Sequence, residues 1–187
     1  MAEMNDSSAV QDKAYIGFIK NVKEDIFIKG AVANIKRYSP SPSGEFERDG
    51  IKYKLVEEKS VENTVCDLGN AMAARRFMSA VETMLLTHMA VGTGTGGKTS
   101  ASTTLQSEVG RVALDSLTCP AGGAANDNVV TAVATFPAGT GTGALVEAAM
   151  LTAVTDGTMF CYADYGVVTK GAADIVIFTW TSTFGTS

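Results

Sequence analysis

The sequence is poor in the residues that build metal sites. It contains one histidine, His88, and three cysteines, Cys66, Cys119 and Cys161, that stand far apart in the chain. A zinc site needs closely spaced Cys or His ligands, and neither a CxxC pair nor a second histidine is present. We therefore expect three unpaired cysteines in the core, no metal and no cofactor.

Catalytic constellations are also missing. There is no GxSxG motif, and the neighbours of His88, Thr87 and Met89, supply no nucleophile with an orienting carboxylate. Glu147 lies in the apolar run LVEAAML, where a paired or solvent-facing carboxylate is expected more often than a general base. We predict that the protein is not an enzyme and has no catalytic residues.

Long hydrophobic runs and an excess of positive charge are lacking as well. Arg75 and Arg76 interrupt the longest apolar stretch, so we expect no membrane-spanning segment. The first 25 residues have no basic region followed by an apolar core, so we expect the protein to stay in the cytoplasm where it is made, or inside something assembled there, rather than to be secreted. The net charge is -5, and residues 61–187 hold only five basic side chains, which argues against a nucleic-acid partner.

What the chain does contain changes in character near residue 60. Residues 1–60 hold ten acidic and ten basic side chains, whereas residues 61–187 hold ten acidic and five basic and are rich in Gly, Ala and Thr. We divide the chain into a polar N-terminal arm (1–13), an N-terminal β-hairpin region (14–60) and a body of one helix plus a β-sandwich (61–187). Asp49-Gly50 predicts a type I′ turn in a hairpin over residues 45–55.

Hydrophobic periodicity predicts a mainly β fold. Apolar residues recur at three- and four-residue steps over 68–86, which predicts one α-helix that Asp67 or Asn70 would cap. Alternation with period two then dominates, most clearly over 109–115, 129–136 and 175–181. The spacing of six such strands is typical of an antiparallel β-sandwich, which we expect to be jelly-roll-like with the N-terminal arm extended from it.

One motif points elsewhere. Residues 92–99, GTGTGGKT, match the P-loop pattern GxxxxGK[ST], in which Gly92, Gly97, Lys98 and Thr99 would bind a nucleotide and its magnesium. That mechanism also requires a helix directly after the lysine and an apolar strand that ends in Asp. Residues 100–108, SASTTLQSE, do not favour the helix that should follow the lysine. We therefore interpret the motif as an ordinary loop and keep a small P-loop enzyme as a remote alternative.

Several segments together resemble a family of virion structural proteins of tailed bacteriophages. The matching segments are ENTVCDLG (62–69), THMAVGTGT (87–95), LQSEVGRVAL (105–114), the Gly- and Ala-rich stretch 136–151, and TWT (179–181). The resemblance spans about two thirds of the chain. It departs at the polar loop, where the family usually has Thr-Thr and this chain has Gly-Gly-Lys. Members of the family are tail-fibre, baseplate, collar and capsid accessory proteins.

The resemblance implies a non-enzymatic component of the virion. We favour a capsid decoration protein, which would cement the head by bridging major capsid subunits, because the chain has no heptads or repeats from which to build a fibre. The alternative is a tail, baseplate, collar or tail-fibre subunit. The last predicted strand places Ile175 and Ile177 on a face that the core leaves uncovered, so these residues are candidate interface positions in a homotrimer. The threefold symmetry rests on the resemblance alone.

Overall fold

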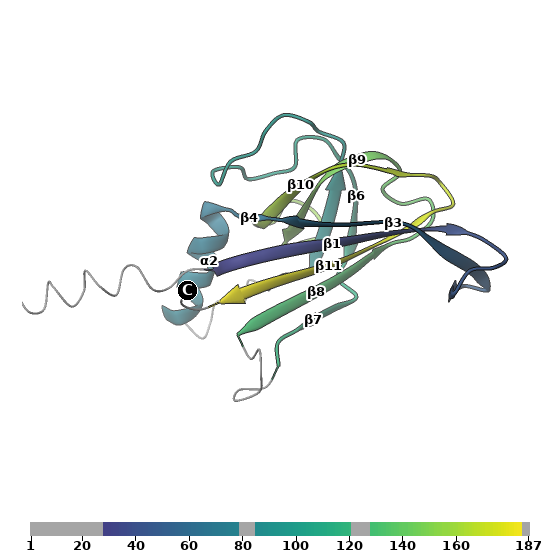
Figure 1. The fold of residues 1–187 in the computed structure, drawn as a ribbon. Helices are drawn as coiled ribbons and strands as arrows, with labels where there is room; N and C mark the ends of the chain where they lie inside the picture. The colour runs from purple at the N-terminus through teal and green to yellow at the C-terminus, as the bar shows by residue number, and fades with distance from the viewer. Residues whose placement is uncertain (1–27, 79–84, 121–127, 185–187) are drawn as a thin grey trace, which may run out of the picture.

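Over the described residues, the protein folds into two antiparallel β-sheets with one helix at one end. A computed structural model describes residues 28–78, 85–120 and 128–184. The six-stranded sheet has the order β2-β3-β1-β11-β8-β7, and the five-stranded sheet has the order β4-β10-β9-β5-β6. The two sheets and the helix are seen in Figure 1. The elements are β1 (Ile28–Pro40), β2 (Phe46–Arg48), β3 (Ile51–Glu62), β4 (Thr64–Val65), α2 (Asp67–Met78), β5 (His88–Gly92), β6 (Glu108–Ala113), β7 (Ser116–Thr118), β8 (Val129–Phe136), β9 (Gly143–Leu151), β10 (Met159–Lys170) and β11 (Ile175–Phe184).

The main core lies between the sheets and follows the alternation of β11. Val176, Phe178 and Trp180 are fully buried there, as the period-two pattern requires. The Phe178 ring packs edge-on against Phe136 of β8 and against Tyr165 of β10, with centroid distances of 5.6 and 5.7 Å. The contact with Tyr165 joins the two sheets. The predicted mainly β fold with antiparallel sheets is confirmed, with one helix in the described residues.

The five-stranded sheet is also covered on its other face. A second apolar cluster of Cys66, Ala90, Leu105, Ala149, Leu151, Met159 and Tyr162 lies there. Leu105 belongs to the segment between β5 and β6, residues 93–107, which we call the β5–β6 loop. Because both faces of β9 are covered, every residue from Leu145 to Leu151 is buried, and the strand reads as a continuous apolar run interrupted only by Glu147.

The predicted hairpin at the other end of the molecule is confirmed. β2 and β3 pair with Glu47 opposite Lys52 and Arg48 opposite Ile51. Asp49 and Gly50 have φ angles of 53° and 76°, and positive values at both central residues define the type I′ turn. The right-handed twist of this turn suits the twist of the strands it connects, which explains why Asp-Gly marks the position in the sequence.

Two expectations need correction. The division near residue 60 is wrong as a packing boundary, because β3 runs through it and β1 is a central strand that pairs with both β3 and β11. The helix begins at Asp67, one residue before the predicted start, and its described part ends at Met78. The predicted end at residue 86 is wrong, because Leu85 and Leu86 are not helical. Residues 79–84 and the N-terminal arm (1–13) lie outside the described residues.

Candidate functional site

The carboxylate of Glu147 is a buried charged group that several polar groups contact. Its side chain is fully buried on β9, between β5 and β10. Three backbone amides of the β5–β6 loop donate to it: Gly94 N and Ser107 N to Oε1, at 3.1 and 2.8 Å, and Gln106 N to Oε2, at 3.0 Å. A carboxylate that accepts several amide hydrogen bonds is stabilised in its charged form. The loop is thereby fastened along the neighbouring strand.

Lys98 completes this cluster. Its ammonium forms an ion pair with Glu147 Oε2, and the Lys98 side chain is only 4% exposed. The Nζ atom also lies 5.9 Å from the centre of the Tyr162 ring, a distance at which the π face attracts a cation. Burial lowers the pKa of Lys98, and the charge of Asp164 opposes that shift. We call Lys98, Glu147 and the three donating amides the Glu147 lock.

The glycines of the loop permit this close approach. A β-carbon at Gly92 would collide with Glu147 Oε1 and would lie 2.6 Å from Ser107 O. One at Gly94 would lie 2.8 Å from Glu147 Oε1 and 2.5 Å from the Gln106 β-carbon. Heavy atoms do not tolerate such distances, so the glycines at positions 92 and 94 are explained by contact with a buried carboxylate.

The geometry of the P-loop look-alike is therefore that of an internal cross-link. Lys98 contacts Glu147, Thr99 N donates to Ser102 Oγ at 3.1 Å, and a β-carbon at Gly97 would meet nothing within 4 Å. The segment after Lys98 consists of turns and irregular backbone up to β6, without the helix that a P-loop requires. Gly92, Gly97, Lys98 and Thr99 are thus not arranged as a phosphate cradle.

The other residues singled out from the sequence lie apart from the lock. Nδ1 of His88 is 2.8 Å from Thr87 Oγ1. Cys66 and Cys161 are buried thiols, and burial raises both pKa values, that of Cys66 to about 11 with a contribution from Asp67. Cys119 is exposed, so the expectation of a core residue is wrong for it. Within the described ranges no group of His, Cys, Asp and Glu side chains is arranged to hold a metal ion.

The two candidate interface residues differ in exposure. Ile177 is half-buried on β11, opposite Lys36 and Thr135 of the neighbouring strands. Ile175 is only 2% exposed within a single chain. It lies directly opposite Tyr38, whose ring packs against Phe46 of the hairpin at 5.3 Å, and paired residues share a face of the sheet. The structure therefore does not support Ile175 as an interface residue.

A second charged cluster ties β1 to the turn before β11. Asp174 accepts hydrogen bonds from Ser39 Oγ at 2.7 Å, Gly171 N at 2.9 Å and Arg37 Nη1 at 3.2 Å. Burial alone would raise the pKa of Asp174, but these donors and the Arg37 charge outweigh burial and lower it. Nearby, the buried Lys170 donates to Pro137 O at 2.9 Å. These polar groups are used in holding strands together.

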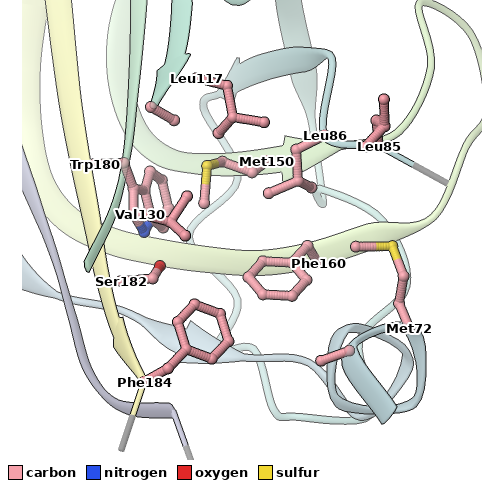
Figure 2. A pocket seen from close by; sticks show the side chains of 12 residues that line it. Met72, Leu85, Leu86, Leu117, Val130, Met150, Phe160, Trp180, Ser182 and Phe184 are labelled. Atoms are coloured by element: carbon pink, nitrogen blue, oxygen red, sulfur yellow. The ribbon is translucent and has the colours of Figure 1, made fainter. Parts of the chain in front are cut away.

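An apolar cavity of about 290 Å³ opens between the sheets beside α2. Figure 2 shows side chains from α2, β7, β8, β9, β10 and β11 around it. Its one polar side chain is Ser182, whose Oγ is buried and has no hydrogen-bond partner within the described parts of the chain. The sequence analysis missed this cavity. One feature of the sequence could have indicated it: a serine among the inward-facing residues of the last strand, which are Val176, Phe178, Trp180, Ser182 and Phe184.

Comparison of the chain with protein-family models, with curated proteins and with solved structures gave no match. None of the helical segments in the described ranges has the length and hydrophobicity that a membrane crossing requires.

Proposed function

We propose that the protein is a non-enzymatic structural subunit of a tailed-bacteriophage particle, and within that class a capsid decoration protein. It would bind the major capsid protein and bridge neighbouring subunits of the head. The proposal combines the sequence resemblance with one structural observation, the composition of the Glu147 lock.

The lock draws together three segments of the phage-like pattern that are distant in sequence. Gly94 comes from THMAVGTGT, Gln106 and Ser107 come from LQSEVGRVAL, and Glu147 comes from the Gly- and Ala-rich stretch. Their polar groups bond to one another inside the protein rather than facing a cleft. A pattern whose polar residues meet in an internal cross-link supports a role in holding a shape, which is what an assembly subunit needs.

A decoration subunit acts through its contact area. An interface of ~1,500 Å² per copy, repeated at every joint of the shell, adds a large total free energy even when each contact has modest affinity. The folded body has two sheets and no repeat in its described ranges, which suits a cap over a joint better than a reaching fibre. The polar residues 1–13 would contribute by binding a neighbouring subunit.

Copy number in purified particles tests this proposal. We expect quantitative mass spectrometry, or densitometry of a stained gel, to find hundreds of copies per particle, in a fixed ratio to the major capsid protein. Three, six or twelve copies would instead assign the protein to the tail, baseplate or collar. Absence from particles purified away from host protein would overturn a virion role altogether.

Deletion of residues 1–13 supplies a second test. The segment MAEMNDSSAVQDK has little apolar content, so its removal should leave the melting temperature of the isolated protein unchanged. Incorporation into particles should fall sharply when the truncated chain is the only copy present. Undiminished incorporation would show that the arm does not hold the subunit in place.

A further inference from the structure

We propose that the cavity beside α2 is a binding site for one small, neutral, amphiphilic molecule, such as a medium-chain alcohol. The site would be independent of the Glu147 lock and of the proposed role in the virion. Its lining, its size, its access to solvent and one unsatisfied hydroxyl lead to this assignment.

The walls of the cavity come from both sheets and from the helix. Trp180 and Phe184 of β11 face Met150 of β9 and Phe160 of β10, and Met72 of α2 closes one end (Figure 2). All of the described residues that line it are apolar except Ser182, and none of them is charged. Hydrocarbon is therefore the main chemistry that this space accepts, and a charged headgroup would find no counter-charge in it.

Ser182 supplies the specific polar contact. The residue is 3% exposed, and Figure 2 shows its hydroxyl on the side of the strand that faces Val130, Phe160 and Phe184. A buried hydroxyl without a partner destabilises the folded state, and an apolar residue would fit the inward stripe of β11 better. A ligand hydroxyl at this position would satisfy Ser182 and would be held at one end of the cavity.

The volume sets the size of the ligand. A cavity of about 150 Å³ accepts a benzene ring. The volume of about 290 Å³ is nearly twice as large and matches a molecule of roughly ten non-hydrogen atoms.

Leu85 and Leu117 line the same cavity but are 52% and 40% exposed, so they mark its connection to the surface. Exposed leucines at the mouth of an apolar cavity give a route of entry.

Trp180 makes the proposal easy to test, because it is the only tryptophan in the chain and it lines the cavity. Bromine quenches indole fluorescence at contact distance. We would titrate the full-length protein with three ligands of similar chain length: ω-bromooctanol, bromooctane and ω-bromooctanoate. Saturable quenching is expected with the alcohol, weaker binding with bromooctane, and the weakest with the charged octanoate.

Three variants separate the site from non-specific binding. Ser182→Ala should weaken binding of ω-bromooctanol roughly fivefold, equivalent to about 1 kcal/mol, and leave bromooctane binding unchanged. Val130→Phe should fill the cavity and abolish saturable quenching by both. Ser60→Ala, on the exposed part of β3, is the matched control and should bind as the wild type does. Circular dichroism and melting temperature establish that each variant is folded.

The proposal fails if quenching by ω-bromooctanol does not saturate, or if folded Val130→Phe is quenched as strongly as the wild type. It also fails if ω-bromooctanoate binds as tightly as the alcohol. Equal affinities of wild type and Ser182→Ala for the alcohol would overturn the role of the hydroxyl. None of these results bears on the copy number in particles, so the site and the proposed function stand or fall separately.

Discussion

Replacement of Glu147 by glutamine tests the central structural interpretation. The amide keeps the shape of the carboxylate, but it removes the negative charge and places an NH₂ group where one oxygen stood. If the remaining oxygen still accepts from Gly94 N and Ser107 N, the NH₂ group faces Gln106 N and the ammonium of Lys98, all of which are donors. The Lys98 charge is then buried without its carboxylate partner.

The size of the effect follows from that geometry. Removal of one member of a buried ion pair typically destabilises a protein by about 3–5 kcal/mol. We expect Glu147→Gln to fall in this range and to lower the melting temperature by about 6–20 °C. Lys98→Met should have a smaller effect, about 1–3 kcal/mol, because the three loop amides still stabilise the carboxylate and the methionine fills the space of the lysine stem.

Urea unfolding of the two single variants and the double variant measures these terms. The double variant should lose less stability than the sum of the single changes, by at least about 1 kcal/mol, because the residues are in contact. Glu108→Gln is the matched control: Glu108 pairs with Arg111 at a partly exposed site, and its loss should change stability by less than about 1 kcal/mol.

Hydrogen exchange supplies an independent readout. The amides of Gly94, Gln106 and Ser107 should be protected in the wild type and should exchange faster in Glu147→Gln. A Glu147→Gln protein within about 1 kcal/mol of the wild type, with loop amides still protected, would refute the claim that the carboxylate fastens the loop.

Three further predictions concern other parts of the fold. Asp174→Asn should be less stable than the wild type at neutral pH. Because the pKa of Asp174 is lowered in the folded state, the difference in stability between the two proteins should shrink as the pH falls below 3.8, the ordinary pKa of the group. Melting curves from pH 7 to 3 would contradict this if the difference in stability stayed constant. Gly92→Ala should destabilise the folded protein by about 1–3 kcal/mol, whereas Gly97→Ala should stay within about 0.5 kcal/mol of the wild type. Equal urea midpoints for the two variants would contradict the claim that Gly92 is required by its contact with Glu147. The isolated protein should associate and Ile177→Asp should dissociate it; light scattering that finds the wild type at 19.5 kDa would exclude this interface.

Local features of the fold were predictable because their physical cause is local. Asp49-Gly50 specifies a turn through the φ angles that these two residues tolerate, and the alternation along β11 specifies a strand through burial of every second side chain from Val176 to Ser182. The boundary near residue 60 was predicted wrongly because charge density reports exposure, not connectivity. β3 carries charged side chains at the exposed positions Lys52, Lys54, Glu58 and Glu62, and yet it runs past residue 60 and pairs with β1 in the middle of the larger sheet.

The candidate site was only partly predictable. Glu147 and Lys98 were both noticed, the first as a carboxylate that is paired or faces solvent, the second as part of a misleading motif. Their contact was not foreseen, because the pairing depends on the path of the β5–β6 loop and because three of the partners of Glu147 are backbone amides, which leave no trace in the residue types. Ile175 was misjudged for a similar reason, because the residue opposite it on the neighbouring strand is Tyr38, which is distant in the sequence.

The pairing of β1 with β11 has a consequence for how the chain reaches this structure. Tyr38 lies opposite Ile175, so roughly 130 residues must be synthesised after β1 before its partner exists. At ~5–20 residues per second this takes about 7 to 26 seconds. During that time β3 can protect one edge of β1, but the other edge carries unpaired amides and carbonyls that any passing strand can engage. The two central strands of the larger sheet, β1 and β11, therefore leave the ribosome at different times. The yield of folded subunit should depend on how well the unpaired edge of β1 is kept from other chains during this interval.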